Sequence, residues 1–184
     1  MSGFELSCLD KHSAARRGVL TTAHGPVQTP AFMPVGTAGA IKGVTPEQLR
    51  QTGAEIILAN TYHLMLRPGV DVIENTGGLH KFMAWDGPIL TDSGGYQVFS
   101  LSDLTKIDDN GIEFASHVDG TRIYLDALEA TKIQNRLAPD IAMCLDQCPP
   151  FGCEQKELID AVDRTICWAK ICKDAHKNQR QMYN

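Results

Sequence analysis

The sequence predicts an α/β protein built on a parallel sheet, arranged as the N-terminal half of a (β/α)8 TIM barrel. Short apolar runs rich in Ile and Leu alternate with helical segments, which is the pattern of repeated βαβ units with right-handed crossovers. A doubly wound open sheet is the other closure that this order allows. A full barrel needs about 250 residues, whereas this chain has 184. We therefore expect half a barrel with a small antiparallel β excursion.

The first part of the chain alternates strands with one clearly marked helix. Residues 18–34 indicate short strands broken by "HGP", and "TPAFMPVGT" indicates a buried strand that ends in a loop at Gly36. Thr45 is a natural N-cap, and Pro46 suits the first position of the helix that follows. The run "AEIILANTY" is too short for a helix and predicts a strand buried on both faces. We expect a loop over residues 60–67 after it.

The middle of the chain contains the third strand and the excursion. A helical piece spans about residues 70–76, and "GPILTD" predicts the third buried strand. Residues 100–124 hold two turn signals, "DDNG" and "VDGT", between alternating segments. This pattern predicts a small antiparallel unit rather than another βα repeat.

The last part predicts a helix over residues 126–136, a fourth buried strand in "PDIAMCLDQC" and a long amphipathic helix over residues 154–177. The apolar positions of the long helix include Leu158, Val162, Ile166 and Ala169. The final residues, "KDAHKNQRQMYN", are polar, and we expect no closing strand there. Half a barrel has open sheet edges, so we also expect poor solubility for this chain alone.

Polar residues stand where the predicted strands end. In both parallel architectures ligands bind at the carboxyl ends of strands. Two of these ends carry carboxylates, Asp92 and Asp146. A partly desolvated carboxylate has a tunable pKa and can transfer protons or bind a base. Either aspartate alone is equally compatible with a structural cap, but two on one face favour a site.

The stretch "DSGGYQ" indicates the kind of ligand. Gly94 and Gly95 allow the backbone to approach a ligand and expose N–H donors, and Tyr96 offers a flat face on which an aromatic ring can stack. A tight turn with Tyr96 in the core is the structural alternative. The glycines match neither GxGxxG nor the phosphate-loop pattern, which argues against a dinucleotide or NTP site.

Histidines and cysteines give weaker signals. His24, His80 and His117 favour structural or exposed roles, whereas His63 follows a strand end and is the exception. Cys148 lies two residues past Asp146 and could line the same pocket. The six cysteines have no CxxC spacing, which disfavours zinc binding and favours reduced thiols in the cytoplasm; they are Cys8, Cys144, Cys148, Cys153, Cys167 and Cys172.

Net charge and hydropathy bear on nucleic-acid binding and on membrane association. The net charge is −5 and no basic block is present, so the bulk charge gives no argument for nucleic-acid binding and does not exclude a local patch. No apolar run approaches the roughly 20 residues of a membrane helix, so no membrane association is expected.

Four segments carry a family resemblance. In order, "HGPVQTPAFMPVGT", "LANTYHLMLRPG", "ILTDSGGYQVFSL" and "MCLDQCPP" resemble the successive signatures of bacterial-type tRNA-guanine transglycosylase, also called queuine tRNA-ribosyltransferase. The resemblance covers nearly all of residues 15–175. It implies a (β/α)8 barrel with a zinc-binding insertion near its C-terminus. It also implies a pentosyltransferase that exchanges guanine at the tRNA wobble position for a 7-deazaguanine, through a covalent ribosyl-aspartate intermediate.

The resemblance implies roles for particular residues. Asp92 corresponds to the proton acceptor, which also contacts the base, and Asp146 to the aspartate that recognises the guanine edge. A carboxylate suits that edge because it accepts hydrogen bonds from both N1–H and the exocyclic amine. The rest of the substrate-binding loop corresponds to Ser93, Gly94, Gly95 and Tyr96, with Tyr96 stacking on the purine as a flipped-out base requires.

The resemblance also implies roles for other residues, although less directly. Val35, Asn60 and Gln97 lie in segments that line the ribose and neighbouring pockets in the family. Gln147 stands where bacterial members commonly have Glu, which could change how the pocket treats a cationic aminomethyl group.

The rest of the family machinery is expected beyond residue 184. It comprises the nucleophilic aspartate, a glycine-rich base-binding segment, most of the tRNA surface and the CxCxxC…His zinc ligands. Residues 1–184 would then form a partial catalytic domain that is inactive alone and holds no metal or cofactor. The implied partners are tRNA, a 7-deazaguanine base and, at full length, a second copy of the protein. A non-catalytic base-binding subunit or truncated paralogue is the alternative; without the resemblance, a different barrel enzyme with an acid/base aspartate pair is another.

Overall fold

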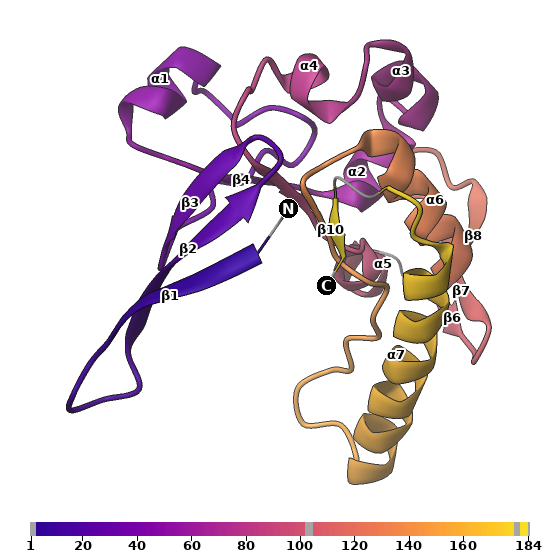
Figure 1. Cartoon of the computed structure of the whole chain (residues 1–184). Helices are drawn as coiled ribbons and strands as arrows, with labels where there is room; N and C mark the ends of the chain where they lie inside the picture. The colour runs from indigo at the N-terminus through magenta and orange to yellow at the C-terminus, as the bar shows by residue number, and fades with distance from the viewer. Residues whose placement is uncertain (1–2, 102–104, 179–180, 184) are drawn as a thin grey trace.

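The computed structural model of the chain describes residues 3–101, 105–178 and 181–183 and shows an α/β protein with three sheets (Figure 1). A parallel sheet lies between two antiparallel ones, with strand orders β10-β9-β5-β4, β1-β2-β3 and β6-β7-β8. The strands are β1 Gly3–Leu9, β2 Arg16–Thr22, β3 Gly25–Thr29, β4 Ile57–Ala59, β5 Ile89–Thr91, β6 Lys106–Ile107, β7 Gly111–Ala115, β8 Arg122–Asp126, β9 Ile141–Ala142 and β10 Met182–Tyr183. The helices are α1 Pro46–Gln51, α2 Thr61–Leu66, α3 Val70–Asn75, α4 Leu79–Met83, α5 Gly95–Leu101, α6 Ala127–Leu137 and α7 Gln155–Ala175.

The parallel sheet follows the order of the chain. β4 pairs with β5, β5 with β9 and β9 with β10, all in parallel. Val35 forms an isolated parallel bridge to Leu58 on the other side of β4. Strand order in a doubly wound sheet reverses at a switch point, and the described strands contain no such reversal. Their order is the one found in (β/α)8 barrels, and the sheet that they form is open.

Local sequence signals produced several elements as expected. Thr45 caps α1 in a capping box with Gln48, and Pro46 is its first residue. The excursion is antiparallel, with "DDNG" between β6 and β7 and "VDGT" between β7 and β8; residues 102–104 of this segment lie outside the described part. The Asp126 side chain caps α6 by accepting the Glu129 N–H.

Two predictions for the first half were wrong, and three elements were not predicted. The segment "TPAFMPVGT" contributes only the Val35 bridge, and Phe32 and Val35 are exposed, because two prolines remove the donors that a ladder would need. Residues 60–67 form α2 instead of a loop, since Tyr62 and Leu64 are fully buried when the segment turns into a helix. Elements β1, α4 and α5 carried no signal that we recognised.

The C-terminal tail contains a short strand that the sequence did not predict. It was expected to bring no closing strand, and it adds β10 at the edge of the parallel sheet, where the Met182 N–H donates to the Asp140 carbonyl at 2.7 Å. The strand extends the sheet and does not close it. Residues 179–180 and 184 of the tail are outside the described part.

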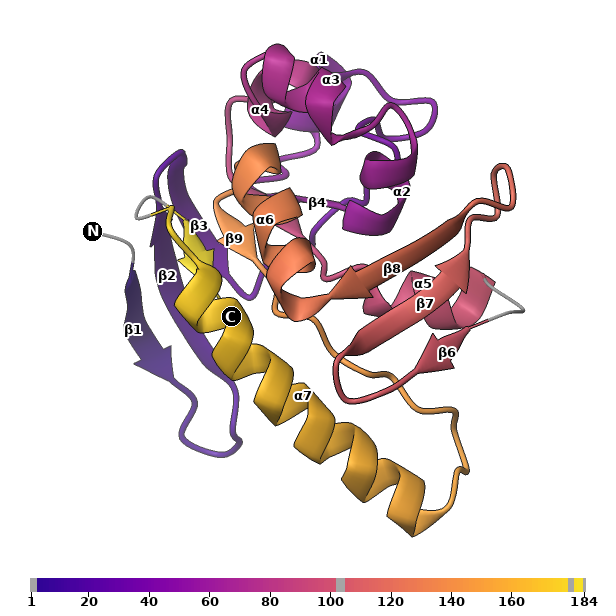
Figure 2. The same cartoon turned by 90° about the vertical axis from the view of Figure 1, so that its right-hand side faces the viewer.

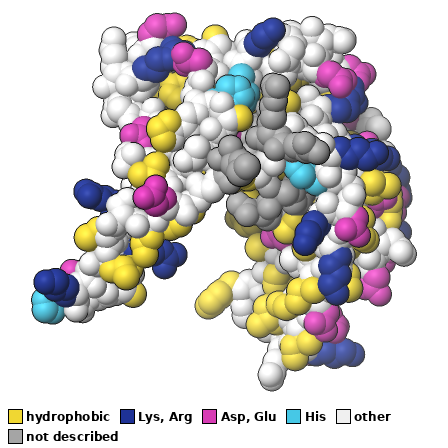
Figure 3. All heavy atoms as spheres, in the orientation of Figure 1, with side chains coloured by type: hydrophobic (Ala, Val, Ile, Leu, Met, Phe, Trp, Pro, Cys, Tyr) yellow, Lys and Arg dark blue, Asp and Glu magenta, His cyan; other side chains and the backbone are white. Residues whose placement is uncertain are grey.

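Helix α7 forms where expected but buries a different stripe. It packs against α6 (Figure 2), and its buried residues are Ala161, Trp168 and Cys172. Three of the four apolar positions predicted to face the core, Leu158, Val162 and Ile166, are about half exposed. Hydrophobic side chains are correspondingly visible on the α7 arm at the lower right of Figure 3.

The main core lies between the parallel sheet and the helices α2, α3, α4, α6 and α7. Its members with the largest fully buried side chains include Trp168, Tyr62 and Phe114. No helix within the described ranges is long and apolar enough to cross a membrane.

Candidate functional site

Two neighbouring strand ends bring the predicted carboxylates together. Asp92 directly follows β5, and Asp146 lies just beyond β9, the strand that pairs with β5. Ser93 Oγ donates a hydrogen bond to Asp146 Oδ1 at 2.7 Å. Because both segments leave the same edge of a parallel sheet, the two aspartates belong to one site at its carboxyl end.

Neutral donors hold the Asp92 side chain. Oδ2 accepts from Asn60 Nδ2 at 2.5 Å and from Gln97 Nε2 at 2.8 Å. Oδ1 accepts the Thr61 N–H at 2.8 Å, and the Thr61 hydroxyl donates to the Asp92 carbonyl at 2.6 Å. A carboxylate has about four lone-pair positions, so these three bonds orient it and leave acceptor capacity on Oδ1.

The two glycines serve packing between loops. Gly94 has a φ of 83°, and a Cβ there would lie 3.3 Å from the Tyr62 nitrogen. A Cβ on Gly95 would lie 2.5 Å from the Asp146 carbonyl oxygen. The expectation that the glycines expose N–H donors is wrong for Gly95, because its N–H donates to Ser93 Oγ at 3.1 Å.

Tyr96 is available to a ligand. It lies in the first turn of α5 with 59% of its surface exposed, so the alternative that places it in the core is excluded. Gln97, the next residue, turns toward Asp92. Helix α5 therefore presents an aromatic face and an amide beside the same carboxylate.

Sequence reasoning missed Thr61 and ranked Asn60 and Gln97 below the other residues. The structure places all three in direct contact with Asp92. Asn60 and Thr61 directly follow β4, and the pairing of β4 with β5 brings them to Asp92. Val35, also at a strand end, is exposed and bridges to β4.

A cluster of aromatic and imidazole rings lies beside Asp92. Tyr62 Oη is 2.8 Å from His117 Nδ1, and the His63 and His117 ring centroids are 5.6 Å apart. Burial lowers the pKa of His63, proximity to His117 lowers it further, and the charge of Asp92 opposes the shift. Neutral His63 is thus favoured next to the site.

The segment after Asp146 is fastened to α7. The Gln147 N–H donates to Thr165 Oγ1 at 3.1 Å, and Arg164 donates to the Gln147 side-chain oxygen. Arg164 also binds Asp109 on the β6–β7 turn at 2.9 Å. The Gln147 oxygen is therefore engaged by α7.

The cysteines do not form a metal site in the described part of the chain. All six are free thiols. Within the described ranges, the single group with metal-ligand geometry contains His24, His80 and Asp140 and no cysteine. Burial raises the pKa of Cys144, which disfavours its thiolate.

The carboxyl edge of the parallel sheet carries two linked carboxylates and an exposed aromatic ring. This arrangement is typical of α/β proteins that bind ligands, and can transfer protons, at strand ends. Residues 10–184 match the family model described as queuine tRNA-ribosyltransferase. The chain belongs to the queuine tRNA-ribosyltransferase family.

Individual relatives agree with this family. A queuine tRNA-ribosyltransferase of Desulforamulus reducens is 52% identical over 172 residues, which cover 94% of this chain and 46% of the relative. That of Synechococcus sp. (strain CC9311) is 50% identical, covering 98% and 49%. That of Staphylococcus aureus (strain JH9) is 54% identical, covering 91% and 44%. The chain spans about half the length of the curated relatives it matches.

Proposed function

We propose that the full-length protein containing this chain is a tRNA-guanine transglycosylase. This pentosyltransferase exchanges guanine at the wobble position of tRNAs with GUN anticodons for 7-aminomethyl-7-deazaguanine or queuine, in queuosine biosynthesis. Family membership supports the reaction class. The single observation that carries the proposal is the pairing of Asp92 and Asp146 at adjacent strand ends, joined through Ser93.

Residues 1–184 form, in this proposal, one partial catalytic domain, the N-terminal half of a (β/α)8 barrel. The sequential order of the parallel strands supports this reading. So does the apolar surface of α7, which half a barrel leaves without its neighbouring elements. The fragment is then inactive alone, because the ribosyl-binding nucleophile is supplied by the other half.

Asp92 is the proposed proton acceptor. Its carboxylate is oriented by Asn60, Gln97 and Thr61, which donate to it without neutralising its charge. A proton acceptor must present an oriented lone pair within hydrogen-bond reach of the base. The remaining acceptor capacity of Oδ1 meets that requirement.

Asp146 is the proposed recognition residue for the guanine-like base. N1–H and the exocyclic amine are two adjacent donors, and a carboxylate accepts from both. Ser93 takes up part of the capacity of Oδ1 and fixes the orientation of the group. Tyr96 then stacks on the ring, with Gly95 bringing its helix close to Asp146 and Gly94 bringing it close to Tyr62.

The zinc ion implied by the family does not fit this chain. A CxCxxC…His set is required, and no three of the six cysteines have that spacing. We place the family zinc and the nucleophile outside residues 1–184 and derive no step through the metal. Binding of tRNA, homodimer formation and a cytoplasmic location are further parts of the proposal.

Incorporation of radiolabelled guanine into tRNA by the full-length protein tests the reaction. We expect exchange, and we expect Asp146→Ala to weaken base affinity by at least about tenfold, since it removes charge-assisted hydrogen bonds. Asp174→Ala, at an exposed carboxylate on α7, is the matched control. Base binding without exchange would favour a non-catalytic subunit, and unchanged base affinity in Asp146→Ala would contradict the recognition role.

A further inference from the structure

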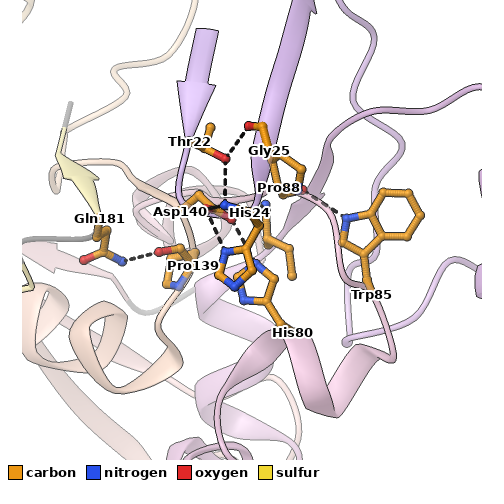
Figure 4. A network of polar contacts seen from close by, with 10 residues as sticks. Thr22, His24, Gly25, His80, Trp85, Pro88, Pro139, Asp140 and Gln181 are labelled. Carbon is orange, nitrogen blue, oxygen red and sulfur yellow. Dashed lines mark hydrogen bonds and ion pairs between the residues drawn. The ribbon is translucent and has the colours of Figure 1, made fainter. Parts of the chain in front are cut away.

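Three side chains from distant parts of the chain meet at the amino end of the parallel sheet (Figure 4). His24 lies in the turn between β2 and β3, His80 lies in α4, and Asp140 directly precedes β9. Asp140 Oδ2 accepts the N–H of Ile89, the first residue of β5. Asp92 follows the other end of β5, so this cluster is separate from the base-exchange site.

The ligand atoms converge on one carboxylate. His24 Nδ1 lies 2.8 Å from Asp140 Oδ1, and His80 Nε2 lies 2.9 Å from Asp140 Oδ2. The two imidazole rings stack with centroids 3.6 Å apart and an interplanar angle of 19°. One potential ligand atom from each residue lies within 4.8 Å of the other two. Zinc binds nitrogen and oxygen at about 2.0–2.2 Å, so the two rings must move slightly away from the carboxylate to admit the ion.

The backbone fixes the cluster before any ion binds. The Asp140 side chain has no exposed surface, and the N–H groups of His24 and Ile89 donate to it at 3.1 and 2.9 Å. Thr22 Oγ1 accepts the His24 N–H at 3.2 Å and donates to the Gly25 carbonyl at 2.8 Å, which holds the turn that carries His24. A preorganised carboxylate with two imidazoles is a donor set that suits a divalent transition metal.

Charge also favours a cation. The Asp140 side chain is fully buried and lies within hydrogen-bond distance of two imidazole nitrogens and two backbone N–H groups. Buried charges in proteins are paired or coordinate metals, and a divalent ion would compensate the carboxylate of Asp140.

A cavity connects the cluster to solvent. It has a volume of about 620 Å³ and is lined by all three side chains together with Lys81. His24 is 42% exposed on this side, whereas His80 is 13% exposed. The cavity provides a route for an ion and room for water as a fourth ligand. The charge of Lys81 opposes a cation in this cavity, which makes Lys81 useful in the test.

We propose that His24 Nδ1, His80 Nε2 and a carboxylate oxygen of Asp140 bind a zinc ion, with water from the cavity completing a tetrahedral site. On binding, the proton of each neutral ring moves to its other nitrogen, His24 Nε2 or His80 Nδ1. The ion joins the β2–β3 hairpin, α4 and the start of β9. It stabilises the amino end of the sheet by binding only the folded state.

Metal content of the purified full-length protein tests the site by difference. Because any zinc bound elsewhere is common to all variants, wild type is expected to hold one equivalent more zinc than His24→Gln. His12→Gln, at an exposed histidine in the β1–β2 loop, is the matched control and should retain the wild-type content. Equal zinc content in wild type and His24→Gln, after dialysis against micromolar zinc, would overturn the proposal.

Titration of the metal-free full-length protein with Co²⁺ identifies the ligands, because the difference spectrum between wild type and His24→Gln removes the signal of any other metal site. In that difference spectrum we expect visible d–d absorption without a near-ultraviolet thiolate band, and the affinity of this site should be at least about tenfold lower in both His24→Gln and His80→Gln. Lys81→Met should bind Co²⁺ at least as tightly as wild type, because it removes the opposing charge. A thiolate band in the difference spectrum, or wild-type affinity in both histidine variants, would assign the ion to other residues.

Discussion

Substitution of Gly95 by alanine adds a single methyl group at the point where the two acidic segments touch. The ideal Cβ position is 2.5 Å from the Asp146 carbonyl oxygen and 3.2 Å from Asp146 Oδ1. Ordinary carbon contacts begin near 3.5 Å, so the turn after β5 and the segment after β9 must separate by roughly 1 Å. Both sides of the main contact are backbone, so no flexible side chain can absorb the shift.

The size of the effect of Gly95→Ala on stability and activity follows from the separation of the two segments. The Ser93–Asp146 hydrogen bond of 2.7 Å would lengthen beyond hydrogen-bonding distance, which ends near 3.5 Å. Overpacking of this kind costs about 1–3 kcal/mol of folding stability. A misplacement of about 1 Å at a catalytic site can lower the rate about 10²-fold. We expect a loss of that order in kcat/KM for guanine exchange.

The assay compares guanine exchange and urea denaturation for the full-length wild type, Gly95→Ala and Gly3→Ala. Gly3 has no atom within 4 Å of an added Cβ, so its variant controls for the chemical change alone. Neither glycine adopts a positive φ, which removes backbone strain as an explanation. Exchange by Gly95→Ala within about threefold of wild type, where a change of about 10²-fold is expected, would refute the claim that the two segments must touch.

Two further predictions concern His63 and the isolated chain. The folded-state pKa of His63 is lowered from its ordinary value of 6.5, so the unfolded state binds a proton on His63 more readily than the folded state. The contribution of His63 to folding stability is therefore fully present above pH 6.5 and is lost as the pH falls through the folded-state pKa. His63→Gln should therefore flatten the decrease in thermal stability of the full-length protein below about pH 6.5, and an unchanged pH profile would show that His63 is not its source. The 184-residue chain alone should form concentration-dependent oligomers by light scattering, because its parallel sheet is open and α7 exposes apolar side chains; a monomer that melts cooperatively would instead favour a complete smaller fold.

Local signals account for the parts of the fold that the sequence predicted. Thr45 and Pro46 mark α1 whatever the rest of the chain does. "DDNG" specifies a turn, and runs such as "PILTD" are too short to be helices. The carboxylates at strand ends could be proposed as a site for the same reason, since strand direction alone decides which edge they share.

Features that depend on tertiary neighbours could not be predicted. Nothing local shows that Gly95 packs against a backbone that follows it by about fifty residues, or that Thr61 reaches Asp92. The core-facing stripe of α7 is Ala161, Trp168 and Cys172, and more hydrophobic residues stay exposed because of what packs beside the helix. His24 was assigned a structural or exposed role because its partners, His80 and Asp140, lie far along the chain.

The central claim is that Asp92 handles a proton in a nucleobase-exchange site. It is tested most directly by the initial rate of labelled-guanine incorporation into tRNA by full-length Asp92→Asn. Asparagine keeps the size of the side chain but cannot take up a proton at neutral pH. General acid–base catalysis typically contributes about 10²–10⁴-fold, so we predict a rate at least about 10²-fold below wild type. A rate within about twofold of wild type, against that expected range, would contradict the account.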